Sequence, residues 1–324
     1  MGCHTQNFFV ILWPFQWLFA LNGFLYVGFL GVDIFFVISG FLITGLLYGE
    51  VKSQIRVKKF YTRRFFKIIP QYVMLLLVCL VFLRPPIQQF IPQIFFLQNY
   101  FPGVFSLGHT WSLAIEEHFY FIYLLILYLI CWVAKDVQYR NQLIIGVLLT
   151  LIICANVARW QGLPPGYFSY FNQMTHFRID ALSAGCLLRL LYEKWGRNKI
   201  LQSLAGLFCV GGIIIYFYII LCFQQLEWFH YTLAYLGAGL LISSCLWKCE
   251  PMETAMGNPL LRWIGRNSYG IYLWHYVLFY LSPIRQQNNA KFIILYVFLA
   301  IMIGALSTIT IERFFLNLRK RYCP

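Results

Sequence analysis

The chain has 324 residues, of which 60% are hydrophobic, 20% aromatic and only 11% charged. Because soluble domains usually carry about a quarter charged residues, this composition excludes an ordinary soluble protein and predicts a polytopic membrane protein. The net charge of +14 would suit a nucleic-acid partner, unless membrane topology accounts for it.

The beginning of the chain differs from the rest. His4 precedes a mostly apolar stretch, 7–27, which Pro14, Gln16 and Asn22 interrupt, and this pattern predicts a re-entrant or interfacial segment. Alternation of the later spans puts the first residue on the outer side of the membrane. We therefore expect either that a first helix is truncated or that the opening residues insert as a hairpin.

Nine apolar stretches follow, each about 15 to 25 residues long, which suits a hydrocarbon core about 30 Å thick. Their ranges are 28–49, 68–84, 112–133, 142–158, 177–192, 200–222, 232–247, 267–281 and 292–311. Lipid offers no partner to a free backbone amide, so every span must be helical. The sequence predicts an all-α bundle of nine to ten transmembrane helices in a single domain, 1–324.

The basic residues orient these spans. If the span at 28–49 ends in the cytoplasm and the spans alternate, all but five of the 25 lysines and arginines lie on the cytoplasmic side. The five exceptions are Arg84, Arg159, Arg178, Arg285 and Lys291. This bias follows the positive-inside rule and explains the net charge without nucleic acid. We expect a multi-pass protein of the inner (plasma) membrane.

Ionisable side chains gather at the outer ends of three spans. Asp33 begins the first of these spans, within GVDIFFVISGFLITG. HTWSLAIEEHFYFIYLL contributes His109, Glu116, Glu117 and His118, and HFRIDAL contributes His176, Arg178 and Asp180. Acids, bases and a cation at one face are what an acid–base site needs. Two alternatives remain open: a carboxylate that complements a helix dipole, and an interfacial polar collar.

The inner side carries a different pattern. The predicted loop before the second span, 56–67, interleaves basic with aromatic residues, among them Lys59, Tyr61, Arg63 and Arg64. A loop that anchors to anionic lipid is one interpretation. A site for a phosphorylated ligand is the other, because guanidinium groups match phosphate oxygens and aromatic rings can stack on an adenine. The ten cysteines form no Cys-x-x-Cys pair, and we predict no metal site.

Five motifs together resemble the acyltransferase 3 family of integral-membrane O-acyltransferases. They are GVDIFFVISGFLI, FYTRRFFKIIP, TWSLAIEEHFY, RIDALSAGCLL and IGRNSYGIYLWH, in that order, and the resemblance runs from about residue 4 to 314. The family implies ten transmembrane helices and an acyl-coenzyme A donor, commonly acetyl-coenzyme A, from the cytoplasm. It implies an acceptor hydroxyl on a cell-surface glycan or lipid-linked sugar.

The resemblance also implies residue roles. Asp33, Glu116 and Glu117 are expected near the reaction centre, and His4 occupies the place of the family's catalytic base. An arginine normally precedes that histidine by about eleven residues and would fall before Met1, which leads us to expect a truncated first helix or an inactive family member. Arg63 and Arg64, with Lys59 and Tyr61, are expected to bind coenzyme A. Trp111, Ser112, Arg178 and Asp180 are expected to bind the acceptor.

The expected mechanism is direct transfer, in which His4 takes the proton of a sugar hydroxyl while that oxygen attacks the thioester. No serine or cysteine lies beside an evident base, so we do not predict an acyl-enzyme on either residue type. For His275, within YLWHYV, a packing role and a functional role both remain open. The alternative function is a transporter or flippase of a polar lipid or sugar, which often shows inverted repeats that we do not find here.

Overall fold

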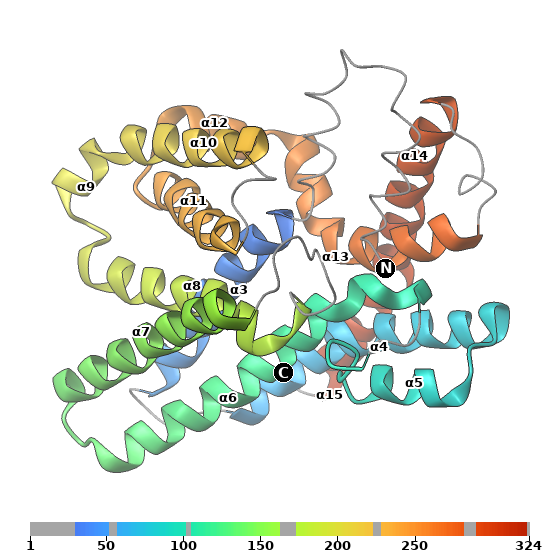
Figure 1. Cartoon of the computed structure of the whole chain (residues 1–324), viewed down its shortest axis with the longest axis horizontal. Helices are drawn as coiled ribbons and strands as arrows, with labels where there is room; N and C mark the ends of the chain where they lie inside the picture. Colours follow the sequence, from blue (N-terminus) through green and yellow to red (C-terminus); the bar gives the residue numbers. More distant parts are fainter. Residues whose placement is uncertain are drawn as a thin grey trace. The chain divides into compact units, whose positions relative to one another are not determined.

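The computed structural model describes residues 30–51, 57–101, 105–162, 173–222, 228–281 and 290–322. These ranges are predominantly helical and contain no strand (Figure 1). Each of the nine predicted spans coincides with a long helix, and seven helices within the described ranges are long and apolar enough to cross a membrane. The predicted all-α membrane bundle is confirmed.

The chain divides into two compact units. The first unit contains α3 (Leu30–Val51), α6 (Trp111–Val133), α7 (Val137–Gly162), α8 (Thr175–Trp195), α9 (Lys199–Ser203), α10 (Ala205–Cys222), α11 (Phe229–Leu246) and α12 (Glu250–Gly257). The second contains α4 (Val57–Leu83), α5 (Ile87–Ile94), the 3₁₀ helix η3 (Phe105–Thr110), α13 (Pro259–Leu281), α14 (Ala290–Ser307), the π-helix η7 (Thr308–Glu312) and α15 (Arg313–Tyr322). The unit boundaries fall after Ser53, after Trp111, which is the first residue of α6 and belongs to the second unit, and after Ala255 within α12.

Close backbone contacts hold helix pairs together inside each unit. A Cβ atom added to Gly40 of α3 would lie 1.9 Å from the carbonyl oxygen of Leu182 on α8. In the second unit, a Cβ atom on Gly270 of α13 would lie 2.3 Å from the carbonyl oxygen of Gly304 on α14. Small residues allow such contacts, on which helix packing in lipid depends because no hydrophobic effect drives the helices together.

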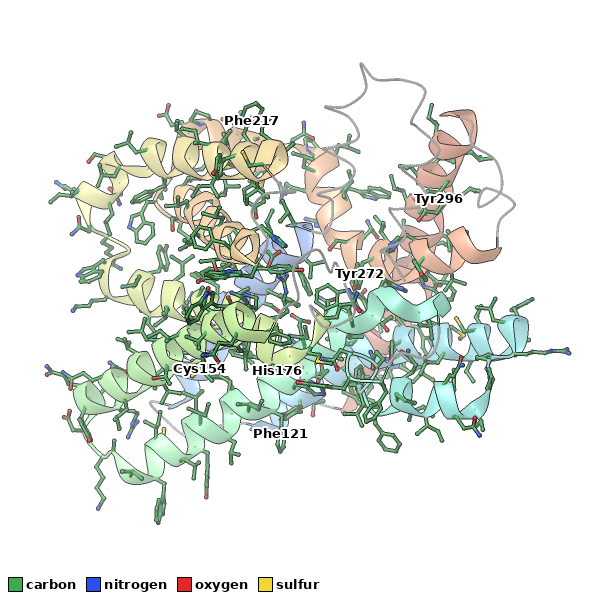
Figure 2. The ribbon with its side chains drawn as sticks, in the orientation of Figure 1. Phe121, Cys154, His176, Phe217, Tyr272 and Tyr296 are labelled. Carbon is green, nitrogen blue, oxygen red and sulfur yellow. The ribbon has the colours of Figure 1, made fainter. Side chains whose placement is uncertain are left out.

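Large apolar side chains face outward, as expected of a surface that meets hydrocarbon. Phe121 on α6 is 67% exposed and Phe217 on α10 is 61% exposed, and both are labelled in Figure 2. Polar side chains lie inside instead. Gln71 of α4 donates a 2.8 Å hydrogen bond to Glu312 and accepts one of 3.1 Å from Ser307. This interaction fixes the π-helical turn against α4.

One local prediction was wrong. The basic and aromatic stretch before the second span is helical from Val57 and belongs to α4, rather than forming a loop as far as Lys67. Lysine, arginine and phenylalanine without glycine are compatible with a helix, and the only proline within α4 is Pro70. Proline is tolerated in membrane helices where neighbouring groups satisfy the freed carbonyl.

Candidate active site

A buried ion pair joins α3 to α8 at the predicted outer end of the first unit. Arg178 donates a 2.6 Å hydrogen bond from Nη2 to Oδ1 of Asp33, and both side chains are 1% exposed. The guanidinium carbon of Arg178 also lies 4.0 Å from the ring centroid of Tyr231 on α11. A buried charge is stable only with a partner, so each of these two charges depends on the other.

A second buried ion pair involves Asp180, two residues after Arg178 on α8. Arg159 of α7 donates to Asp180 at 2.5 Å, to Asn156 at 3.0 Å and to the backbone carbonyl of Phe177. The two acceptors on α8, Phe177 and Asp180, flank Arg178 in sequence, so Arg159 anchors the turn that carries the first ion pair. Sequence reasoning did not select Arg159. The available signal was an arginine at the outer end of an apolar span, where basic residues are uncommon.

The two adjacent glutamates on α6 have different surroundings. Glu116 is 1% exposed, and its Oε1 accepts hydrogen bonds from Ser39 of α3 and from Tyr120, the latter at 2.8 Å. Glu117 is half-buried. Successive residues on a helix point about 100° apart, which explains the difference. Glu116 therefore belongs to a buried polar network between α3 and α6, and Glu117 lies nearer the edge of the unit.

One oxygen of Asp33 remains without an assigned contact. Its Oδ2 is buried and has no hydrogen-bond partner among the residues that the structure describes. An ionised carboxylate has about four acceptor positions, and leaving one oxygen buried without a donor is costly. This oxygen can therefore accept a hydrogen bond from a further donor, such as an imidazole N–H or a substrate hydroxyl.

The remaining predicted acceptor residues lie at the start of α6. Ser112 is buried on its first turn, one turn before Glu116, and Trp111 is the half-buried first residue of the helix. His4 lies outside the described residues. Across the ranges that the structure does describe, no group of three or more histidine, cysteine, aspartate or glutamate side chains could hold a metal ion.

The predicted donor residues lie on the N-terminal half of α4. Arg63 is exposed, and Arg64 is half-buried with its guanidinium carbon 6.0 Å from the ring centroid of Phe60. Tyr61 is half-buried. Lys59 lies on the same helix, but its side chain is outside the described part. Because α4 is helical here, Arg63 and Arg64 point in different directions rather than forming one fork, and Lys67 shares the exposed face of Arg63.

The chain is similar in sequence to known O-acetyltransferases of two bacteria. The chain is 33% identical to the peptidoglycan O-acetyltransferase OatA of Listeria monocytogenes, over 88% of this chain and 51% of the relative. It is 30% identical to the O-acetyltransferase OatA of Staphylococcus aureus, over 77% of this chain and 45% of the relative. The chain thus spans about half the length of the curated relatives it matches.

No solved structure matches the chain at a significant level. The family model for the acyltransferase domain, Acyl_transf_3, matches residues 1–312. That match covers Asp33, Glu116, Arg178 and the basic half of α4 together. The chain is a member of the acyltransferase 3 family of membrane proteins.

Proposed function

We propose that the chain is the membrane domain of an O-acetyltransferase, which moves an acetyl group from cytoplasmic acetyl-coenzyme A to a hydroxyl group of peptidoglycan or of a lipid-linked sugar. The family assignment and the printed functions of the two relatives support the reaction class. The name of the Listeria relative supports peptidoglycan as the acceptor. The proposal treats the two compact units as parts of one acyltransferase domain in the plasma membrane.

The proposal depends mainly on the buried Asp33–Arg178 ion pair. Arg178 binds one carboxylate oxygen of Asp33, and the other oxygen has no hydrogen-bond partner among the described residues. Ionisable groups inside a membrane are expensive, and they usually mark a functional site. Arg178 binds Oδ1 of Asp33, and Oδ2 is then able to hold the N–H of a histidine whose other nitrogen accepts the proton of the acceptor hydroxyl. The resemblance assigns that histidine to His4.

The other outer residues have supporting roles in this proposal. Glu116 holds α6 against α3 through Ser39 and fixes the beginning of α6, where Ser112 is buried. Asp180 anchors the turn of Arg178 through Arg159. Trp111 and Glu117 are only half-buried, so they are the members of the set that a sugar can reach most easily.

The donor site of the proposal is the basic half of α4. Arg63 and Lys67 are exposed on one face, and Arg64, Tyr61 and Phe60 lie around it. Coenzyme A carries several phosphates and an adenine, and these groups suit guanidinium forks and aromatic rings respectively. Positive charge on the cytoplasmic side also favours the approach of an anionic donor from that compartment.

The test is a transfer assay on membranes that contain the wild-type chain or Arg178→Met. Radiolabelled acetyl-coenzyme A is supplied with and without peptidoglycan fragments, and alkali-labile label on the glycan is counted. We expect acceptor-dependent label with the wild type and none with Arg178→Met. Transport of unmodified glycan into sealed vesicles, with no ester formed, would instead identify a transporter and overturn the proposal.

A further inference from the structure

The net positive charge of the chain belongs entirely to the second unit. Residues 54–111 and 256–324 contain fifteen lysines and arginines and one acidic residue, Glu312, whereas the first unit contains ten basic and ten acidic residues. The positive-inside rule explains basic residues at a cytoplasmic end, but it does not require acidic residues to be scarce there, because they contribute little to topology. An excess of this size in one unit favours an anionic ligand.

The last helix adds basic side chains to those of α4. Helix α15 contacts α4 within the second unit (Figure 1). Its last turn carries Arg319, Lys320 and Arg321. Arg319 is half-buried, whereas Lys320 and Arg321 are exposed. Two helices of this unit thus contribute cations at its predicted cytoplasmic end.

Polar contacts give the relative direction of α4 and α15. Gln71 of α4 donates a 2.8 Å hydrogen bond to Glu312 and accepts one of 3.1 Å from Ser307, five residues earlier in the chain. Lys67, one turn nearer the beginning of α4, interacts electrostatically with Glu312. The beginning of α4 therefore lies toward Glu312 and α15, so the two helices run antiparallel, as alternating spans require.

This register places Arg319 opposite Arg64. Arg64 precedes Gln71 by seven residues and Arg319 follows Glu312 by seven, so each arginine lies on nearly the same face of its helix, about 10 Å nearer the predicted cytoplasmic side. Helical side chains lean toward the beginning of their own helix, so the two guanidinium groups of this antiparallel pair extend toward each other. Both arginines are half-buried, as expected of residues that face a neighbouring helix.

Two guanidinium groups that face each other repel unless an anion lies between them. In the first unit, Arg159, Arg178 and Arg189 each pair with a carboxylate. In the second unit the one acidic side chain, that of Glu312, is held by Gln71 two turns away. A phosphate monoester carries nearly two negative charges on three acceptor oxygens, and it can therefore bind two guanidinium forks at once.

We infer that Arg319, with Lys320 beside it, binds the 3′-phosphate of the coenzyme A ribose opposite Arg64. The inference rests on the proposed function and deepens it. The 3′-phosphate is the monoester of coenzyme A, whereas each phosphate of its diphosphate carries a single charge, which the exposed Arg63 and Lys67 of α4 suit. Arg319 is then a specificity-determining residue, because it distinguishes coenzyme A from adenine nucleotides that lack a 3′-phosphate.

The first test measures binding and does not depend on turnover. Radiolabelled coenzyme A is bound to membranes that contain the wild-type chain and is displaced by unlabelled coenzyme A or by 3′-dephospho-coenzyme A. We expect the dephospho compound to be about tenfold weaker with the wild type, and the two compounds to differ by no more than about twofold with Arg319→Gln. An unchanged tenfold difference in Arg319→Gln, or no difference in the wild type, would overturn the inference.

Control variants separate this site from general electrostatics. Arg313→Gln removes the same charge from an exposed position on another face of α15, and it should keep the tenfold difference. Should Arg319→Gln not fold, Arg319→Lys and Lys320→Gln repeat the test. Arg319→Lys retains the charge and should keep most of the difference, whereas Lys320→Gln should reduce it about threefold. The full difference in a folded Lys320→Gln variant would count against the site.

The second test separates the donor from anionic lipid, whose headgroups offer similar phosphate oxygens. The purified chain is reconstituted in vesicles of phosphatidylcholine, with or without phosphatidylglycerol, and we expect the same effect of Arg319→Gln in both. An effect that requires phosphatidylglycerol would assign Arg319 to lipid and overturn the inference. Arg319-dependent binding of coenzyme A by membranes that transfer no acetyl group would count against the proposed function and leave the inference supported. Normal acetyl transfer with no preference for the 3′-phosphate would overturn the inference alone.

Discussion

Removal of Arg178 should have a large effect on stability as well as on transfer. Arg178→Met leaves Asp33 buried and unpaired, and loss of one partner from a buried pair costs about 3–5 kcal/mol. The guanidinium also lies 4.0 Å from the Tyr231 centroid, and a desolvated cation–π contact adds about 1–2 kcal/mol. We expect the free energy of unfolding of Arg178→Met to fall by at least 3 kcal/mol, measured by reversible denaturation in detergent micelles.

A double-mutant cycle isolates the ion pair. In Asp33→Asn/Arg178→Met neither charge remains, so the double variant should be more stable than the sum of the two single effects predicts, by at least about 1 kcal/mol. Arg189→Met provides a matched control, because its pair with Glu193 is partly exposed and should contribute less than about 1 kcal/mol. Additivity of the two single changes within about 0.5 kcal/mol would refute the view that Asp33 and Arg178 depend on each other.

Three further predictions address packing, the donor and topology. Gly40→Ala should destabilise the chain by about 1–3 kcal/mol in the same denaturation assay, because its Cβ would meet the α8 backbone, whereas Gly31→Ala, with nothing within 4 Å, should be nearly neutral. Arg63→Ala should raise the KM for acetyl-coenzyme A about tenfold in the membrane assay through loss of a charge-assisted hydrogen bond, and an unchanged KM would remove Arg63 from the donor site. A cysteine at Lys135, just before α7, and one at Gln161, at the end of α7, should react with an impermeant thiol reagent from opposite sides of sealed vesicles. Labelling from one side only would overturn the assumed alternation.

The helices were predictable because backbone groups in lipid must form their hydrogen bonds within the protein. An apolar run of sufficient length must satisfy its own backbone, and this rule located the nine long helices of the described ranges from their composition. The limits of α4 were less predictable. Its first residues are charged and amphipathic, so hydropathy assigned them to a loop, whereas helix propensity and the contact of α4 with α15 favour a continuous helix.

The charged residues of the candidate active site could be predicted from the sequence, but the residues with which they pair could not. Asp33, Arg178 and Asp180 stood out as charges at the ends of apolar spans. The pairing of Asp33 with Arg178 joins positions 145 apart in sequence, and that of Ser39 with Glu116 joins positions 77 apart. Such pairings depend on which helices become neighbours, and helix packing in lipid follows small-residue contacts that hydropathy does not encode.

The tautomer of His275 was also beyond sequence reasoning. A histidine within an apolar span is compatible with packing and with catalysis alike, and the choice depends on which ring nitrogen meets an acceptor. The Tyr272 carbonyl lies only one turn away on the same helix, and its contact with Nδ1 depends on the side-chain conformation of His275.

The central claim is that the chain transfers an acetyl group from a donor on one side of the membrane to a glycan hydroxyl on the other. Purified protein reconstituted in proteoliposomes tests it most directly, with radiolabelled acetyl-coenzyme A presented on the side of the α4 basic residues and peptidoglycan fragments on the opposite side. We predict that alkali-labile label appears on the fragments in proportion to the coenzyme A thiol released on the donor side. Arg178→Met should yield neither the labelled fragments nor free coenzyme A. Release of neither product by the wild-type chain, with both substrates present on their respective sides, would contradict the account.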